Sequence, residues 1–339
     1  MKALVTGGGG FLGSAIVRLL LARGDSVHTL QRGDYPWMLA QGVVPFRADL
    51  SRDTDSLLQA AKGCDVVIHT AAKAGVWGPL RDYHEANVLA VQHVLDACRK
   101  AGVSRLVHTS SPSVCFAGTD ESGVDESRPY PARFLAHYPR TKAAAERLVL
   151  NTNSPGLATL ALRPHLIWGP GDPHLVPRLI ERARAGRLRL VGSGNNRVDS
   201  TYIDNAAQAH LDAADALLAQ GHQAPAAGRA FYISNGEPIP MRELINRILH
   251  AGGLAPITRG VPPALAYAAG AALEAIYGLF RRSDEPVMTR FVARQLGTEH
   301  WYRLDAARAA IGYRPRVSLD EGMRRLAASL ANPNGAAHA

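Results

Sequence analysis

The start of the chain holds the feature that most constrains its fold. A short aliphatic run, residues 3–6, passes directly into the turn G-G-G-G-F-L-G, from Gly7 to Gly13, and a helical pattern over residues 11–23 follows. Glycines at such a turn let the backbone approach a pyrophosphate, and the free N–H groups of the helix N-terminus point at it. We therefore predict a dinucleotide site, with these residues at the phosphates: Gly7, Gly10, Phe11, Leu12 and Gly13.

Strand and helix patterns alternate beyond this turn. Aliphatic runs at 26–31, 65–70 and 105–110 are separated by helical periodicity, for example over 83–99. Alternation of this kind is typical of βαβ units and a parallel sheet. The predicted fold is α/β: a Rossmann-type doubly wound parallel sheet over 1–168 with a return segment at about 200–228, and a smaller mixed α/β substrate lobe over 169–199 and 229–330. Only the tail, 331–339, is expected to fall outside the folded part.

The charge balance raises the question of an acidic partner. The chain of 339 residues carries a formal charge of +9, and a basic surface attracts nucleic acid and anionic lipid. The arginines are spread along the chain, however, and the densest run, 178–189, falls at helical spacing, as a solvated helix face would. We expect no nucleic-acid partner.

Cysteine usage and the N-terminus bear on the compartment. The three cysteines include no C-x-x-C pair, which argues against a disulfide framework and against a zinc site. The sequence opens directly on the first strand pattern, without an export signal. A cytoplasmic location and no bound metal are the expectations.

The end of the second strand pattern bears on the choice of cofactor. NAD-specific folds place an acid there, whereas NADP-specific folds place an arginine for the 2′-phosphate. The pattern ends L-Q-R-G, with Arg32 and no acid, which favours NADPH. Arg32 as an ordinary surface residue is the alternative. Asp49 and Leu50, at the end of a short strand, suit an adenine contact, although Asp49 could instead cap a turn or helix.

A tyrosine and a lysine stand four residues apart at the start of a predicted helix, 138–150. This spacing puts Tyr138 and Lys142 on one face of the helix, where an ammonium can stabilise the phenolate. Only five of the 38 basic residues are lysines, so a lysine here indicates a need for a compact ammonium. Ser111 follows the strand 105–110 at its carboxyl end, where it can hold a substrate carbonyl, with Ser110 in reserve. Serines that merely cap the following loop are the alternative.

Taken in order, these motifs resemble the extended short-chain dehydrogenases/reductases over nearly the whole chain. The resemblance implies that Tyr138 is the acid–base group, that Lys142 lowers its pKa and binds the nicotinamide ribose, and that Ser111 polarises the carbonyl. The matching segments are T-G-G-G-G-F-L-G, Asp49-Leu50, His69-Thr70-Ala71-Ala72, Asn87-Val88, Thr109-Ser110-Ser111, Tyr138-x-x-x-Lys142, Arg163-Pro164 and Thr201-Tyr202-Ile203-Asp204.

The same resemblance implies further roles. Ala71 and Ala72 would line the cofactor, Asn87 would shape its helix near the site, and Pro164 and Ile167 would flank the nicotinamide. Cys115 and its neighbour replace the Tyr-Gly often found after the catalytic strand, which bears on substrate shape.

Three segments are similar to the 3β-hydroxysteroid dehydrogenase branch, and within it to the bacterial reductases of 2-alkyl-3-oxoalkanoates in long-chain olefin synthesis. They are Ala72–Gly78, Ser111–Val114 and Phe134–Tyr138. The resemblance implies reduction of a lipid-like 3-oxo acid with NADPH, and a complex with the enzymes that turn the product into an olefin. A homo-oligomer is also expected.

Other functions stay open. A 3β-hydroxysteroid or sterol dehydrogenase is the first alternative. A sugar-nucleotide epimerase or dehydratase would need polar groups for a diphosphate in the second lobe, which the apolar stretch 254–280 disfavours. A non-catalytic NADPH-sensing module would not need the Tyr, Lys and Ser set.

A 3-oxo acid carries a carboxylate, whose burial without a cation would be costly. Lys73 and His165 are the candidate partners, and Trp77 is a third candidate substrate residue. The alternative readings are a solvated lysine and a core histidine.

An apolar segment over 262–280 has helical periodicity. Leu265, Ala269, Ala272, Ile276 and Leu279 form one stripe, whereas Tyr267, Gly270 and Glu274 fall toward the other side. The stripe predicts either a core helix, the wall of a channel for alkyl chains, or a contact with a membrane surface.

Overall fold

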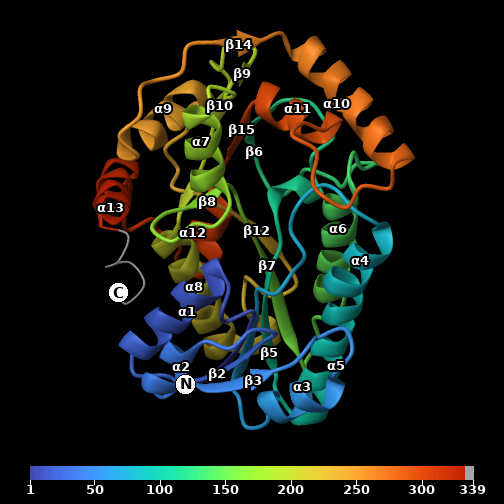
Figure 1. Cartoon of the computed structure of the whole chain (residues 1–339). Helices are drawn as coiled ribbons and strands as arrows, with labels where there is room; N and C mark the ends of the chain where they lie inside the picture. Colours follow the sequence, from blue (N-terminus) through green and yellow to red (C-terminus); the bar gives the residue numbers. More distant parts are fainter. Residues whose placement is uncertain (333–339) are drawn as a thin grey trace.

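A seven-stranded parallel sheet forms the centre of the larger lobe (Figure 1). The computed structural model describes residues 1–332, so 333–339 of the expected unfolded tail lie outside the described residues. The sheet order is β12-β7-β5-β4-β1-β2-β3, and every neighbouring pair runs parallel. The strands are β1 (Lys2–Thr6), β2 (Ser26–Gln31), β3 (Val44–Arg47), β4 (Val66–His69), β5 (Arg105–Thr109), β7 (Ala158–Pro164) and β12 (Ala230–Ile233).

Helices cover both faces of this sheet, which is the doubly wound arrangement. One face packs against α1 (Phe11–Ala22) and α8 (Ile203–Gln220), and the other against α3 (Thr54–Ala61), α5 (Ala90–Ala101) and α6 (His137–Asn151). Side chains alternate between the two faces because successive strand residues point in opposite directions. The α/β fold class is as the sequence predicts, and α8, which lies in the segment 200–228, packs on this sheet.

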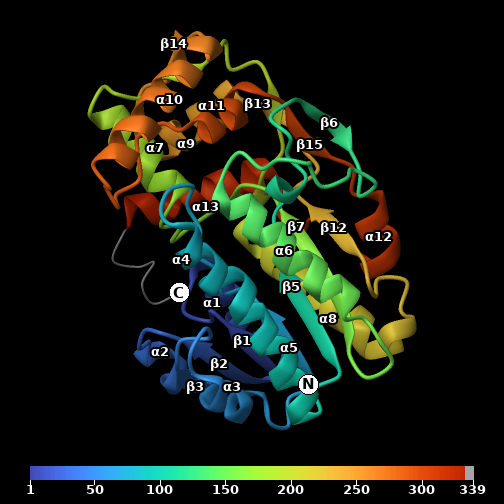
Figure 2. The same cartoon turned by 90° about the vertical axis from the view of Figure 1, so that its right-hand side faces the viewer.

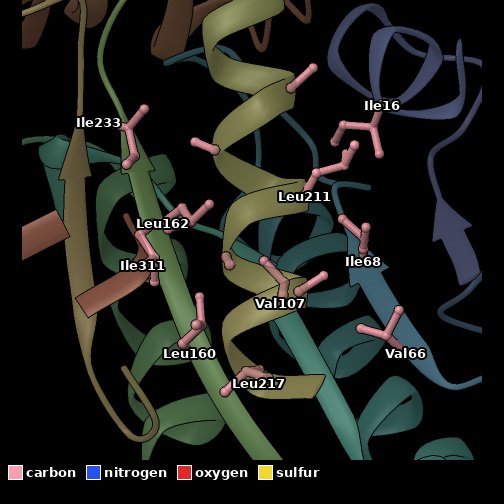
Figure 3. Close-up of a cluster of buried hydrophobic side chains, with 14 of the residues drawn as sticks. Ile16, Val66, Ile68, Val107, Leu160, Leu162, Leu211, Leu217, Ile233 and Ile311 are labelled. Atoms are coloured by element: carbon pink, nitrogen blue, oxygen red, sulfur yellow. The ribbon is translucent and has the colours of Figure 1, made fainter. Parts of the chain in front are cut away.

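Aliphatic side chains fill the space between the sheet and α8 (Figure 3). Val107 and Leu160 point from the strands toward Leu211 and Leu217 of the helix, and all four are buried. This layer holds α8 against the sheet.

The second lobe is built on smaller sheets. A four-stranded sheet has the order β13-β10-β15-β6, and two further pairs are β11-β8 and β14-β9. Its strands are β6 (Glu121–Val124), β8 (Ile167–Trp168), β9 (Leu190–Val191), β10 (Arg197–Val198), β11 (Thr201–Tyr202), β13 (Ile239–Pro240), β14 (Gly260–Val261) and β15 (His300–Tyr302). Its helices are α7 (Leu175–Arg184), α9 (Met241–Ala251), α10 (Pro263–Leu279), α11 (Arg290–Gly297) and α13 (Leu319–Ala331).

Two segments cross the boundary that the sequence suggested. β12 falls within 229–330, which was expected in the second lobe, but it forms the edge of the main sheet beside β7, and α12 (Asp305–Ile311) packs on it. Conversely, β6 lies in the first 168 residues but pairs with β15 of the second lobe. The lobes are therefore interleaved along the chain more than linear boundaries allow.

Two helices also differ from expectation. The helix predicted over 83–99 consists of α4 (Leu80–His84), a π-helical turn η1 (Glu85–Leu89) and α5. The apolar stripe of α10 faces solvent, whereas Ala266 and Gly270 are the buried positions, so the core-helix reading of that stripe is wrong. Within residues 1–332, none of the helices combines the length and the apolarity that crossing a bilayer needs.

Candidate active site

The candidate residues meet at the carboxyl edge of the main sheet. β1, β4, β5 and β7 run parallel and neighbour one another in the sheet, so the segments that follow them converge at one edge. Gly7, Ala71, Ser111 and His165 each stand just beyond one of these four strands. This edge of an open α/β sheet is where ligands bind. α6 crosses beside β7 and brings in the tyrosine and the lysine (Figure 2).

The glycine turn is crowded in the way a phosphate loop requires. Gly7 has a φ of +72°, and a Cβ on Gly13 would lie 2.1 Å from the Gly7 carbonyl oxygen. Gly10 is the N-cap of α1 and donates its N–H to that carbonyl over 2.8 Å. No side chain caps the first turn of α1, so its N–H groups are available to a pyrophosphate. Gly7, Gly10, Phe11, Leu12 and Gly13 therefore fit the phosphates of a dinucleotide.

The charged side chain of Arg32 lies at the end of the second strand, β2, as the sequence predicts. Arg32 follows β2 and is exposed, and Asp49 follows β3. The Ser51 hydroxyl and backbone N–H both donate to Asp49 and lower its pKa, with smaller contributions from the charges of Arg32 and Arg52. Leu50 is buried beside them. Arg52 is a second cation at this position, which the sequence pattern did not single out.

Lys142 is buried at the centre of the site. Its ammonium donates to the Thr109 carbonyl oxygen over 2.6 Å and lies 3.4 Å from Nε2 of His108. Burial lowers the pKa of Lys142 to about 8, although the carboxylate of Glu146, one helical turn further on, raises it. Lys142 is thus anchored to the end of β5 rather than extended into solvent.

Tyr138 and Ser111 lie near each other. Tyr138 is half-buried on α6, one turn before Lys142. Burial raises the pKa of the Tyr138 phenol, and hydrogen bonding from Ser111 partly offsets the rise. The Ser111 hydroxyl is also 2.9 Å from that of Ser113. Ser110 is buried and its hydroxyl lowers the pKa of Glu146, so the geometry favours Ser111 over Ser110 as the partner of a carbonyl.

A buried ion pair lies beneath these residues. Arg163 donates two hydrogen bonds to Glu146, at 3.0 and 2.6 Å, and the Tyr130 hydroxyl donates a third over 2.6 Å. These bonds and the Arg163 charge lower the pKa of Glu146 despite its burial. The carboxylate therefore stays charged, which helps to keep Lys142 charged.

Two histidines to which the sequence analysis assigned no role lie against Lys142. His69 and His108 are paired across β4 and β5, and their rings stack with centroids 5.3 Å apart. His69 also bonds to the Thr6 hydroxyl over 2.7 Å. Burial and the Lys142 charge lower the pKa of both rings, so both are neutral near pH 7. Because residues alternate between the faces of a strand, His69 and His108 fall on the same face of neighbouring strands, and this pattern is the signal that could have found them.

Asn87 lies in the π-helical turn and links three segments. Its amide accepts from the Lys73 N–H over 2.7 Å and donates to the Lys73 carbonyl over 3.2 Å. It also donates to the Thr141 hydroxyl on α6 over 3.1 Å. Turns of this kind often occur at functional sites. Here the turn connects the loop after β4 to the helix that carries Tyr138.

The candidate substrate residues Lys73 and Trp77 lie in the loop after β4. The Lys73 ammonium is half-exposed and pairs with Asp82 over 3.4 Å. The Trp77 indole donates to the Arg282 carbonyl over 2.9 Å and meets the Tyr277 ring edge-on. Trp77 thereby ties this loop to the second lobe.

His165 has a different environment. It is buried beside Tyr302 and His300, and its Nδ1 lies 2.9 Å from the Asp199 carbonyl oxygen. Burial lowers its pKa to about 3, so the ring is neutral and its Nδ1 carries the proton. Such a ring supplies no cation for a carboxylate, which favours its reading as a core histidine. Pro164 is buried and Ile167 half-buried at the same strand end.

Fold and site together define a nicotinamide-dependent oxidoreductase of the extended short-chain dehydrogenase/reductase class. Residues 4–259 match the model of the 3-beta hydroxysteroid dehydrogenase/isomerase family. The chain belongs to this family.

Curated relatives extend over the whole chain. A protein of Stenotrophomonas maltophilia named 2-alkyl-3-oxoalkanoate reductase is 52% identical over 98% of this chain and 100% of its own length. One of Shewanella oneidensis with the same name is 48% identical over 97% of this chain and 86% of its own. The mouse sterol-4-alpha-carboxylate 3-dehydrogenase, decarboxylating, is 36% identical over 96% of this chain and 89% of its own.

Solved structures share the architecture. MoeE5 in complex with UDP-glucose and NAD is 26% identical, with a TM-score of 0.75 over 98% of this chain and 99% of that one. The UDP-glucose 4-epimerase of Thermus thermophilus in complex with NAD is 28% identical, with a TM-score of 0.72 over 98% and 99%. These neighbours support a nicotinamide cofactor in this fold.

Proposed function

We propose that this protein reduces the 3-oxo group of a lipid-like 2-alkyl-3-oxoalkanoate to the 3-hydroxy acid, with NADPH as the reductant. The observation that carries the proposal is the arrangement of Tyr138, Lys142 and Ser111 at the carboxyl edge, in a chain 52% identical along its length to a 2-alkyl-3-oxoalkanoate reductase. The proposal places the reaction in bacterial olefin synthesis, in association with the enzymes that process the product.

The site residues divide the reaction between them. The glycine turn from Gly7 to Gly13 and Lys142 would hold a reduced nicotinamide cofactor, which would supply the hydride for the carbonyl carbon. Tyr138 donates its phenolic proton to the carbonyl oxygen, and its raised pKa keeps it protonated for that role. Ser111 donates a hydrogen bond to the same oxygen. Lys142, charged and fixed by Thr109, stabilises the phenolate that remains.

The sterol alternative shares one chemical feature with the first proposal. The names of both groups of relatives put a carboxylate on the carbon next to the reacting carbon. A half-exposed ammonium in the substrate loop, that of Lys73, suits such a carboxylate in either substrate. The two proposed substrates then differ in the shape of their hydrocarbon part, an alkyl chain in one and a sterol ring system in the other.

Product analysis tests the proposal. The purified protein is incubated with NADPH and, separately, with a 2-alkyl-3-oxo acid, a 3-ketosteroid and a nucleotide sugar. We expect the 3-hydroxy acid as the main product, and Tyr138→Phe should lower turnover by orders of magnitude with nearly unchanged cofactor affinity. Turnover of the steroid or the nucleotide sugar alone would refute the substrate, and a wild-type rate in Tyr138→Phe would refute the mechanism.

Cofactor choice is tested at the end of β2. A charge-assisted hydrogen bond contributes roughly 1.5–3 kcal/mol, which corresponds to about a tenfold to hundredfold preference for NADPH over NADH. Arg32→Ala should remove that preference, whereas Arg52→Ala, which changes a neighbouring exposed arginine, should leave most of it. If the ratio of the two kcat/KM values moves only in Arg52→Ala, Arg52 makes the selection. If it moves in neither, the assignment of NADPH through this strand fails.

A further inference from the structure

The outward face of α10 is an uncovered apolar stripe. Leu265, Ile276 and Leu279 are 59%, 48% and 78% exposed, and Ala269 and Ala272 lie exposed between them. The helix stands at the outer edge of the second lobe, far from β1–β3 (Figure 1). Soluble surfaces rarely carry large apolar side chains in a continuous row, so this row indicates an interaction surface.

Packing on the inner face fixes this orientation. A Cβ on Gly270 would lie 2.6 Å from the backbone carbon of Thr289, just before α11, so only glycine allows this approach. Ala266 is buried on the same face. Glu274 also turns inward and accepts hydrogen bonds from the backbone and the side chain of Arg290, at 2.7 and 2.6 Å. The small residues of α10 and Glu274 therefore pack against the rest of the protein, whereas the large apolar side chains of the helix face solvent.

The unpaired charges that bracket the stripe are positive, since Arg282 and Asp284, just beyond it, pair with each other. Glu274 is the only charged residue of α10, and it points inward. Exposed arginines bracket the helix: Arg259 lies before it, and Arg281 lies after it, next to Phe280, which is 70% exposed. In the described part of the chain neither arginine forms an ion pair. Apolar side chains between unpaired arginines complement a lipid surface, in which hydrocarbon lies beneath anionic headgroups.

The stripe adjoins the loop that carries the candidate substrate residues. Tyr277 of α10 packs edge-on against Trp77, and the Arg282 carbonyl accepts from the Trp77 indole. Glu285 accepts from the Val76 N–H over 3.4 Å and pairs with Arg178 over 3.1 Å. Direct contacts therefore join the end of α10 and the segment that follows it to the loop of Lys73 and Trp77.

We propose that the outward face of α10, with Phe280, docks on an anionic lipid surface and presents the Trp77 loop to it. This inference rests on the proposed function in one respect, since a lipid-like substrate gives the docking its use. A second copy of the chain fits less well, because a symmetric contact along α10 would bring arginines of like charge together in a protein of net charge +9.

Vesicle flotation tests the docking with the full-length protein. Vesicles of phosphatidylglycerol and phosphatidylcholine, and vesicles of phosphatidylcholine alone, are mixed with wild type and three variants. Ile276→Asp combined with Leu279→Asp should lower the bound fraction on anionic vesicles more than tenfold. Arg259→Gln combined with Arg281→Gln should lower the affinity about fivefold per arginine, as follows from ~1 kcal/mol per basic residue near an anionic surface. Leu39→Asp, at a leucine that is 67% exposed on α2 (Pro36–Ala40), is the matched control and should bind like wild type.

The outcomes separate this inference from the proposed function. Turnover of a short, water-soluble 2-alkyl-3-oxo acid should be equal in all four proteins, because none of the changed residues lies in the catalytic set. Equal binding of wild type and the aspartate variant to vesicles would overturn the docking and leave the reductase proposal intact. A dimer in light scattering that the aspartates dissociate, with no vesicle binding by wild type, would also overturn it in favour of a second copy. Binding as expected without turnover would instead refute the function alone.

Discussion

At the scale of single residues, the environment of Lys142 decides how the site responds to pH. The ammonium is buried, its pKa is lowered to about 8, and its polar contacts are the Thr109 carbonyl and Nε2 of His108. Because His108 is neutral, its Nε2 can accept a hydrogen bond from the ammonium, which favours the charged form of Lys142. His108 thereby positions Lys142 without touching the substrate.

We predict that His108→Leu shifts the alkaline limb of kcat/KM for ketone reduction downward by about one pH unit. A hydrogen bond to a charged group contributes roughly 1.5 kcal/mol, and one pKa unit corresponds to about 1.36 kcal/mol. His108→Gln, which keeps an acceptor, should restore much of the wild-type profile. A profile that is lower in rate but unshifted in pH would show that His108 serves packing only.

At the scale of elements, helices and strands that depend on neighbouring residues were easier to predict from the sequence than those placed by contacts between distant residues. The unit formed by β1, the glycine turn and α1 was predictable because its glycines act on neighbouring backbone. The place of β12 was not, since it pairs with β7 through contacts nearly 70 residues apart in the sequence. The outward face of α10 was also not predictable from periodicity, because the choice depends on how closely Gly270 approaches the segment before α11.

We predict that Gly13→Ala abolishes tight cofactor binding by moving α1 away from the turn. The added methyl would stand 2.1 Å from the Gly7 carbonyl oxygen, which is backbone and cannot move aside without opening the turn. Gly156→Ala is the matched control, since nothing lies within 4 Å of a Cβ there. Titration by NADPH fluorescence should give a dissociation constant at least tenfold higher for Gly13→Ala and nearly unchanged for Gly156→Ala. Equal affinities would mean that the turn does not hold the pyrophosphate.

At the scale of the whole molecule, the two lobes meet around a buried acid that no sequence motif marked. Asp199 lies between β10 and β11, and its carboxylate accepts from the Tyr302 N–H of β15 over 3.1 Å. Its own N–H donates to the His300 carbonyl over 2.7 Å, and its carbonyl bonds to His165. Ser111 could be singled out because it follows a strand, and Tyr138 and Lys142 because of their spacing on one helix, whereas this junction joins residues from separate parts of the chain.

Burial raises the pKa of Asp199 to about 6 from 3.8, and the hydrogen bonds that it accepts only partly offset this rise. Between pH 4 and pH 6 the folded protein therefore holds a proton that the unfolded chain has lost, so the free energy of unfolding falls as the pH rises. The difference of about two units corresponds to roughly 3 kcal/mol, lost in full above pH 6. We predict that Asp199→Asn, which keeps an acceptor for Tyr302, removes this loss.

Urea unfolding measures this effect: the difference in the free energy of unfolding between Asp199→Asn and wild type is determined at pH 4.5 and again at pH 7.5, and the two differences are compared. The advantage of Asp199→Asn over wild type should be larger at pH 7.5 by about 2 kcal/mol, because roughly 1 kcal/mol of the wild-type loss has already occurred at pH 4.5. Asp96→Asn, at an exposed acid that pairs with Arg99 on α5, is the control and should show a far smaller change with pH. If the two variants change in parallel, the junction between the lobes tolerates a charged Asp199, and the pH dependence of stability arises elsewhere in the chain.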